Sequence, residues 1–303
     1  MDYTALKGYA DMLGCVCREQ APMREHTSFA IGGPADILIE ATSEATLCSL
    51  VEACKKWELP VFVLGNGSNL LVSDDGIEGV VLHISGGMSD VELVGACEIR
   101  CGAGLKLSRL CTFALEHSLT GLEFGWGIPG SAGGAAYMNA GAYDSEMKNV
   151  LLSCRHVDRD GRPGERAGEA LALSYRHSAY ADSGEIITGL HLRLQPGEPE
   201  AIRARMDDLM QRRKSKQPLE YPSAGSVFKR PAGHFAGTLI EQCGLKGYQI
   251  GGAKVSEKHA GFIINVGGAT CSDVRRLIEH IQREVFLQTS IRLEPEIRVV
   301  GRV

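Results

Sequence analysis

The sequence is poor in aromatic residues and contains no long hydrophobic run. Its 303 residues include two Trp, eight Tyr and eight Phe. No stretch approaches the ~20 apolar residues that a membrane-spanning helix needs. Charged side chains from Asp2 to Glu19 interrupt the N-terminus, which lacks the apolar segment of a signal peptide. We therefore expect a cytoplasmic protein that does not bind a membrane.

Signals for metal ions, nucleic acids and disulfides are also weak. The net charge of -5 argues against a general nucleic-acid surface. The histidines lack the H-E-x-x-H spacing, and the pair Cys15 and Cys17 has no His or Cys partners nearby, so no metal site is predicted. The ten cysteines are scattered, and Cys48, Cys54 and Cys111 occupy apolar positions of helical patterns. We expect reduced thiols that act as small core residues.

Glycine is the abundant residue. The chain has 37 glycines, with 44% hydrophobic and 23% charged residues, which is typical of a soluble globular protein. A length of 303 residues favours more than one domain. Glycine permits tight turns and close backbone approach, so this composition indicates loops that surround a ligand.

Periodicity predicts a mixture of helices and strands. Helical spacing covers residues 42–57, 105–117, 200–216 and 272–289. Strand patterns cover residues 60–64, 79–84, 91–94, 98–101, 150–157, 185–194, 262–266 and 291–300, with a turn at Asp160 and Gly161 and a linker at 195–199. These elements form no regular βαβ series, so the fold is predicted to be α+β or mixed α/β, with a boundary near residue 200.

Two glycine-rich segments are candidates for ligand binding. Residues 64–69 form a strand end followed by Gly65, Gly67 and Ser68, whose backbone N–H groups and hydroxyl suit a pyrophosphate. An ordinary turn is the alternative. Residues 121–141 contain seven glycines, which excludes a long helix or strand there. Two such loops together indicate an extended ligand, such as a dinucleotide, between them.

A basic region surrounds Ser226. The flanking cations are Arg212, Arg213, Lys214, Lys216, Lys229 and Arg230, a density that suits phosphates or a carboxylate. A solvated basic helix face explains some of these charges equally well. Ser226 does not lie in a G-x-S-x-G motif, so a hydrolase elbow is not supported and a turn serine remains the alternative.

Two further segments carry polar groups. Alternation in the last strand places Glu294, Glu296 and Arg298 on one face, opposite an apolar face formed by Leu293, Ile297 and Val299. An acid and a base would then point into one cleft, or form a surface pair. Tyr175 and Arg176 combine an aromatic ring with a guanidinium, which binds a ligand or caps a loop.

These segments together resemble the UDP-N-acetylenolpyruvoylglucosamine reductase family, from about Thr27 to Val300. The matching stretches are residues 27–33, 64–71, 127–134, 137–143, 175–176, 217–222, 225–226 and 293–298. The resemblance implies an α+β fold with a two-part FAD-binding region of the vanillyl-alcohol-oxidase-like (PCMH-type) class and a smaller α/β substrate-binding domain. The implied boundaries are 1–200 (subdomains about 1–84 and 85–200), 201–290 and a C-terminal strand, 291–303, that returns to the FAD-binding region. The short 141–174 connection resembles the compact form of the family, without a loop that carries a substrate-covering tyrosine.

The resemblance also implies an activity in peptidoglycan precursor synthesis. NADPH would reduce non-covalently bound FAD, whose hydride would reduce UDP-N-acetyl-enolpyruvylglucosamine to UDP-N-acetylmuramate. The enzyme is expected to be a monomer. Ser226 matches the proton donor, and Arg176 and a protonated Glu296 match the groups that stabilise negative charge. Substrate contacts would come from Tyr175, Arg213, Lys229, Arg230 and Arg298. FAD contacts would come from Leu64, Gly65, Asn66, Gly67, Ser68, Asn69, Gly127, Ile128, Pro129, Gly130, Ser131, Gly134, Ala140 and Gly141.

Two other functions use the same loops. A flavin-dependent alcohol oxidase would have no reason to keep the set of Ser226, Arg176 and Glu296. A non-catalytic sensor of a UDP-sugar or nucleotide would purify without flavin absorbance. A hydrolase ranks below both.

Overall fold

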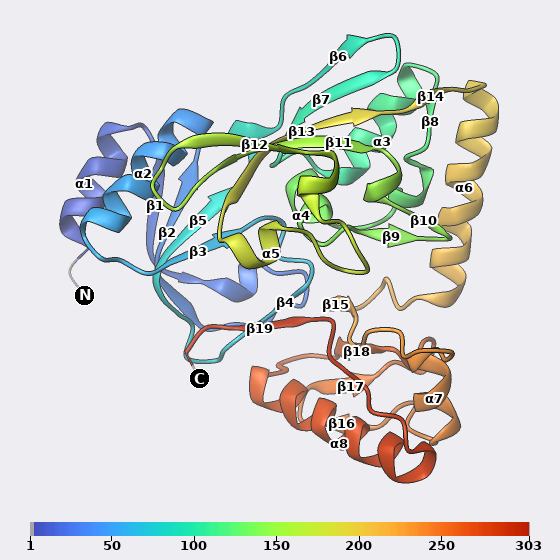
Figure 1. The fold of residues 1–303 in the computed structure, drawn as a ribbon. Helices are drawn as coiled ribbons and strands as arrows, with labels where there is room; N and C mark the ends of the chain where they lie inside the picture. The colour runs from blue at the N-terminus through green and yellow to red at the C-terminus, as the bar shows by residue number, and fades with distance from the viewer. Residues whose placement is uncertain (1–2, 303) are drawn as a thin grey trace. The chain divides into compact units, whose positions relative to one another are not determined.

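The computed structural model describes residues 3–302, and its fold is α+β, as predicted (Figure 1). Its helices are α1 (Thr4–Met12), α2 (Glu44–Lys56), α3 (Leu107–Glu116), α4 (Ala132–Tyr137), α5 (Tyr180–Ser183), α6 (Pro199–Lys216), α7 (Ala236–Gln242) and α8 (Cys271–Thr289). Local sequence fixes several helix starts. The Ser43 hydroxyl accepts a hydrogen bond from the Thr46 N–H at 3.1 Å at the start of α2, and Thr270 caps α8 in the same way.

The strands form several small sheets. They are β1 (Val16–Pro22), β2 (Pro34–Ala41), β3 (Val61–Leu64), β4 (Leu70–Val72), β5 (Ile77–Ile84), β6 (Val91–Gly95), β7 (Glu98–Gly102), β8 (Leu119–Thr120), β9 (Gly141–Ala142), β10 (Ser145–Glu146), β11 (Leu151–Val157), β12 (Pro163–Ala167), β13 (Ile186–Arg193), β14 (Gln195–Pro196), β15 (Ser223–Ser226), β16 (Gln249–Ile250), β17 (Ala253–Val255), β18 (Phe262–Asn265) and β19 (Arg298–Val300). The three largest sheets have the orders β1-β2-β5-β3, β12-β11-β13-β7-β6 and β15-β18-β17-β16.

The chain divides into two compact units. Unit 1 comprises Met1–Glu19, Ile37–Asn66 and Gly79–Gln211, and unit 2 comprises Gln20–Asp36, Gly67–Glu78 and Arg212–Val303. Neither unit is a continuous stretch of chain. The division into FAD-binding and substrate-binding domains stays a prediction, because compactness alone does not assign a ligand to a unit.

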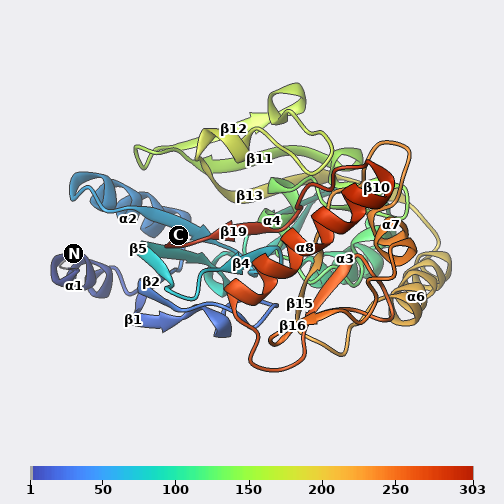
Figure 2. The same ribbon diagram turned by 90° about the horizontal axis from the view of Figure 1, so that it is seen from below.

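The core of unit 1 surrounds the five-stranded antiparallel sheet. Figure 2 shows β12, β11 and β13 side by side, and buried residues from β11 and β13 join those of α2 and α3 in one apolar cluster. Leu47, Leu50 and Cys54 of α2 are fully buried at the predicted helical spacing. In α3, Leu107, Leu110 and Cys111 are likewise buried at the predicted helical spacing.

The core of unit 2 lies between α7, α8 and the sheet β15-β18-β17-β16. Val274, Leu277, Ile281 and Val285 of α8 are completely buried, on the apolar face that the sequence predicts. The C-terminal strand β19 pairs in parallel with β4, with Arg298 opposite Leu70 and Val300 opposite Val72.

The predicted strand at 291–300 is wrong over most of its length. Only residues 298–300 form a strand, and Val299 is 47% exposed although the pattern places it on the buried face. Pro295 explains the break, because it has no N–H for a ladder. It forms an isolated bridge with Phe228, and Lys229 N–H to Glu294 O (2.8 Å) and Glu296 N–H to Val227 O (2.7 Å) flank this bridge.

The remaining sequence expectations concern cysteines, the 195–199 segment and the membrane. All ten cysteines are free, and burial raises the pKa of the Cys54 and Cys101 thiols to about 12, so these thiols are unreactive core groups. The 195–199 segment contains β14, which pairs with β8. Over residues 3–302, none of the helices combines the length and apolarity that crossing a membrane requires.

Candidate active site

The structure brings the two predicted glycine-rich segments together in unit 1. The side-chain amide of Asn66 donates a hydrogen bond to the Pro129 carbonyl oxygen. A Cβ atom on Gly65 would lie 2.8 Å from the Ser131 hydroxyl oxygen. The absence of a side chain at Gly65 therefore lets the first loop approach the second. Leu64, directly before it, is fully buried at the end of β3.

The second segment ends in α4, a helix of only six residues. Its N-cap is Ser131, whose hydroxyl accepts a hydrogen bond from the Gly134 N–H at 3.2 Å. Gly133 packs against Ala103, where a Cβ would lie 2.7 Å from the Ala103 Cβ. Gly127 has φ +85°, a conformation that favours glycine. The glycines thus produce loops and close packing, as the sequence predicts.

These residues fit the diphosphate of a dinucleotide such as FAD. Gly65 and Gly130 are half-buried and carry no side chain that would cover their backbone, and the Ser131 hydroxyl can donate a hydrogen bond to a phosphate oxygen while it caps α4. Ile128 packs against the apolar core of unit 1 and anchors the segment. The donor set is neutral and backbone-rich, which suits a bound pyrophosphate.

The first loop continues into unit 2 at Gly67, which is more tightly constrained than Gly65, the other glycine of this loop. Gly67 is buried with φ +59°, and a Cβ there would lie 2.2 Å from the His26 carbonyl oxygen. Its own carbonyl accepts a hydrogen bond from the Ser28 N–H at 3.2 Å. Ser68 and Asn69 follow, both half-buried. Only glycine satisfies this conformation and this packing together.

Tyr175 and Arg176 form a two-residue turn in unit 1. Ser174 and His177 exchange both backbone hydrogen bonds at 3.1 Å, and Arg176 has φ +56°. The Arg176 guanidinium donates to the Gly141 carbonyl at 3.3 Å and lies 5.2 Å from the centre of the Tyr175 ring. The structure thus joins Arg176 to Gly141, one of the residues predicted to contact FAD.

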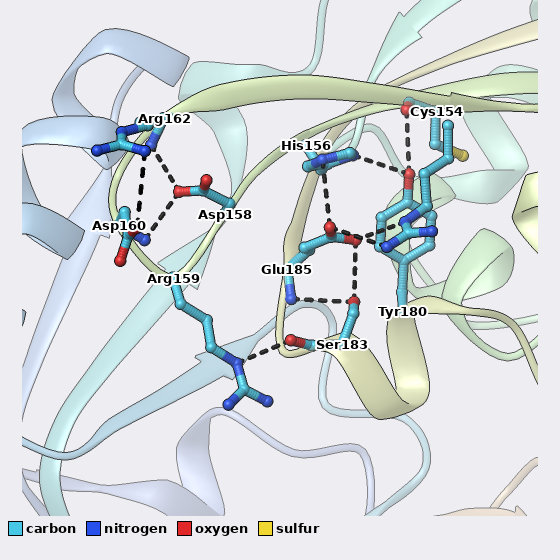
Figure 3. Close-up of polar contacts among 10 residues, drawn as sticks. Cys154, His156, Asp158, Arg159, Asp160, Arg162, Tyr180, Ser183 and Glu185 are labelled. Atoms are coloured by element: carbon cyan, nitrogen blue, oxygen red, sulfur yellow. Dashed lines mark hydrogen bonds and ion pairs between the residues drawn. The ribbon is translucent and has the colours of Figure 1, made fainter.

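A buried polar network follows this turn (Figure 3). The Tyr180 hydroxyl donates to the Cys154 carbonyl at 3.0 Å and lies 3.2 Å from His156 Nδ1, while Glu185 lies on the other side of the imidazole. Arg166 donates two hydrogen bonds to the Glu185 carboxylate and holds the pKa of Glu185 below its usual value. Burial is the main reason that the pKa of Tyr180 is raised. The network fixes α5 to β11 directly after the turn.

In unit 2 the chain next to Ser226 meets Glu296. The two residues in contact, Val227 and Glu296, are 69 positions apart in the sequence. Ser226 is the last residue of β15, and the next residue, Val227, accepts the Glu296 N–H at 2.7 Å. Asn69 joins the same group, since its side-chain amide donates to the Glu296 carbonyl at 3.3 Å and its carbonyl accepts the Arg298 N–H at 3.0 Å. Ser226 is exposed and Glu296 half-buried.

The basic residues of unit 2 separate into different environments. Arg213 is 7% exposed, whereas Arg212, Lys214 and Lys216 on the same helix are exposed, as the solvated-face alternative requires. Lys229 Nζ lies 3.4 Å from Glu294 Oε2 in an exposed ion pair. The Arg230 guanidinium lies 4.0 Å from the centre of the Phe235 ring. Arg298 is exposed at the start of β19.

Two completely buried polar residues, Asn139 and Ser178, contact the Tyr175–Arg176 turn. Neither is among the site residues predicted from the sequence. A signal exists for Asn139 only, because Asn after a short glycine-rich helix is typical of a left-handed helix end, and its φ is +41°. Ser178 gives no such signal, because its partner lies 41 residues away.

Known protein families match both parts of the chain. The FAD binding domain matches residues 35–163, and the C-terminal domain of UDP-N-acetylenolpyruvoylglucosamine reductase matches residues 217–300. The reductase of that name from Clostridium perfringens is 47% identical over 282 residues, 93% of this chain and 92% of the relative. The one from Caldanaerobacter subterraneus is 50% identical over 280 residues, 92% of each chain.

Solved structures agree. The crystal structure of UDP-N-acetylenolpyruvylglucosamine reductase from Thermus caldophilus superposes with a TM-score of 0.81 at 35% identity, covering 94% of this chain and 98% of that one. BBE-like 1 from Physcomitrella patens, with a TM-score of 0.51 at 18% identity over 64% of this chain and 45% of its own, shares the fold alone. The predicted two-part FAD-binding fold is confirmed, and the chain is an FAD-dependent oxidoreductase. It belongs to the UDP-N-acetylenolpyruvoylglucosamine reductase family.

Proposed function

We propose that the protein uses NADPH to reduce the enolpyruvyl ether of UDP-N-acetylglucosamine to UDP-N-acetylmuramate, with Ser226 as the proton donor. Family membership supports the substrate. The observation that supports the residue assignment is the backbone hydrogen bond from Glu296 to Val227, which brings the backbone of Glu296 next to the residue that follows Ser226. We also propose a monomeric, cytoplasmic enzyme.

The glycine-rich segments would hold the FAD without a covalent bond. Ser131 and the backbone of Gly65, Gly127 and Gly130 supply the diphosphate contacts, with Asn66 fixing one loop to the other. The remaining proposed contacts are Leu64, Gly67, Ser68, Asn69, Ile128, Pro129, Gly134, Ala140 and Gly141. FAD held there would supply the hydride chemistry that connects NADPH to the substrate. Within the proposed domain division, these residues lie in the part before residue 200.

The protein has to stabilise negative charge on the substrate carboxylate. Hydride addition to the terminal methylene carbon turns the enolpyruvyl group into an enolate, and its charge spreads onto the carboxylate. A guanidinium at Arg176 and a protonated carboxyl at Glu296 can each donate a hydrogen bond to those oxygens.

The carbon that bears the ether oxygen then needs a proton. A serine hydroxyl is a weak acid, but an enolate is basic enough to take its proton when cations stabilise the alkoxide. Lys229 and Arg230 lie three and four residues after Ser226 and are exposed. Arg213, Arg298 and Tyr175 would bind the diphosphate and the sugar of the substrate.

Measuring the two half-reactions separately tests this function. Anaerobic stopped-flow mixing with NADPH reports flavin reduction, and mixing the reduced enzyme with UDP-N-acetyl-enolpyruvylglucosamine reports flavin oxidation. In Ser226→Ala, reduction stays near the wild-type rate while turnover with substrate falls by about 10²-fold or more, the size of a lost general acid. Ser226→Cys retains more activity, because a thiol also donates a proton. A Ser226→Ala enzyme with normal turnover would remove the proton-donor assignment.

A further inference from the structure

We infer that Asn139 and Ser178 are positioning residues for Arg176, an inference that rests on the proposed role of Arg176 in charge stabilisation. Both side chains are completely buried. Each makes a hydrogen bond between the Ser174–Ser178 segment, which carries Arg176, and the Tyr137–Gly141 segment. The second segment begins at the last residue of α4. We call these two hydrogen bonds the turn clamp.

Asn139 uses both ends of its side chain. Its Nδ2 donates to the Ser174 carbonyl at 2.9 Å, and its Oδ1 accepts the Lys148 N–H at 2.9 Å. A side chain without a donor would leave the Ser174 carbonyl without this hydrogen bond, and one without an acceptor would do the same to the Lys148 N–H. Asn139 therefore connects the start of the turn, at Ser174, to the chain before and after Gly141, at Asn139 itself and at Lys148.

Ser178 holds the other end of the turn. Its hydroxyl donates to the Tyr137 carbonyl at 2.7 Å, two residues before Asn139. Ser174 and Ser178 thus flank Arg176 on either side, and both connect to one short stretch of chain. Arg176 itself donates to Gly141 in that stretch. Three hydrogen bonds thus connect the segment that carries Arg176 to the stretch from Tyr137 to Gly141.

The backbone of Arg176 shows why a clamp is needed. A φ of +56° is unfavourable for an arginine, and such a conformation persists only where the surroundings hold it. Without the clamp the turn can relax, and the guanidinium moves away from the position at which it meets the substrate carboxylate. A displacement of about 1 Å is enough to slow a reaction by about 10²-fold.

A double-mutant cycle tests the inference on the FAD-loaded enzyme. Asn139→Ala should slow flavin oxidation by substrate about 10-fold or more, with flavin reduction by NADPH near the wild-type rate. In an Arg176→Ala background the same substitution should change flavin oxidation less than about 2-fold, because the residue acts through Arg176. Effects that multiply fully in the double mutant would overturn the inference. A single Arg176→Ala enzyme with normal flavin oxidation would instead refute the proposed role of Arg176.

Serine variants provide a test that does not depend on how well Asn139→Ala folds. Ser178→Ala should slow flavin oxidation and couple to Arg176→Ala as Asn139→Ala does. Its matched control is Ser153→Ala, which also removes a buried hydroxyl in unit 1, one that donates to Glu165 at 2.5 Å on β11 and β12. Ser153→Ala should leave flavin oxidation unchanged. Equal slowing in both serine variants would overturn the inference.

Hydrogen exchange gives a readout independent of activity. The His177 amide donates to Ser174 inside the turn, and the Lys148 amide donates to Asn139. In Asn139→Ala both amides should exchange at least about 10-fold faster than in the wild type, while amides of β11 stay protected. A His177 amide that stays as protected as in the wild type would show that the turn does not depend on the clamp.

Discussion

The two units hold their candidate site residues in different ways. In unit 1, buried side chains do so: Asn139 and Ser178 flank the Arg176 turn, and Tyr180 and His156 anchor the helix behind it. In unit 2, Ser226 is placed by its position at the end of β15 and Glu296 by hydrogen bonds of its own backbone, while the Ser226 residue is exposed and Glu296 is half-buried. The difference corresponds to the proposed chemistry, since a fixed charge needs a rigid support whereas a proton donor needs a free hydroxyl.

The largest effect is expected at Gly67, which combines a left-handed backbone conformation with a close backbone contact. Gly67→Ala forces a side chain into a left-handed conformation and against the His26 carbonyl, so the free energy of unfolding should fall by about 3 kcal/mol or more. Gly65→Ala is the comparison variant, because Gly65 has no positive φ and its Cβ meets a side chain, Ser131, instead of backbone, so it should cost only about 1 to 2 kcal/mol through the lost cap of α4. Urea denaturation of both variants measures this. Equal destabilisation would contradict the contrast.

A smaller effect is expected from the buried polar network of unit 1. Tyr180→Phe removes the hydroxyl that bonds Cys154 and His156, so the free energy of unfolding should fall by about 1 to 2 kcal/mol. Tyr248→Phe, at a 42% exposed tyrosine in unit 2, is the control and should change stability little. Thermal unfolding compares them. If Tyr180→Phe is as stable as the wild type, the network does not support unit 1.

The smallest effect concerns a partly buried histidine of unit 2. Burial lowers the pKa of His259 below its usual value of 6.5, so the folded state resists protonation. Above pH 6.5 both states hold a neutral imidazole, and stability is complete. As the pH falls below that value the unfolded chain takes up the proton first, and the free energy of unfolding declines.

His259→Gln should therefore flatten the pH dependence of stability below about pH 6.5, where the unfolded chain takes up the proton before the folded one. His234→Gln, at an exposed histidine, should keep the wild-type slope. Denaturation curves at several pH values measure both. An unchanged slope in His259→Gln would show that other groups cause the acid sensitivity.

The sequence predicts helices and glycine loops well, because their signals are local. Ser43 and Thr270 mark helix starts, and the glycines near Gly65 and Gly130 mark the loops. Pro295 argues against a continuous last strand, but the alternation of polar and apolar side chains around it favoured one. Val299 is exposed because burial depends on what covers a strand, which periodicity does not record.

Long-range pairings could not be predicted from local patterns. Nothing near Ser178 points to Tyr137, and nothing near Asn69 points to Glu296. The assembly of unit 2 from three separate stretches of chain could not be predicted from local patterns either. The roles of Arg176, Ser226 and Glu296 come from the family resemblance and stay a prediction, because spacing carries no information about distant partners.

The parallel pairing of β4 with β19 has a consequence for biosynthesis. Leu70 leaves the ribosome more than two hundred residues before its partner, Arg298. Until then the apolar Leu71, completely buried in the finished protein, has no strand beside it. Unit 2 therefore cannot complete its fold while the chain is still growing through α8, and a chain interrupted before residue 298 would present β4 to chaperones and proteases as an unpaired edge.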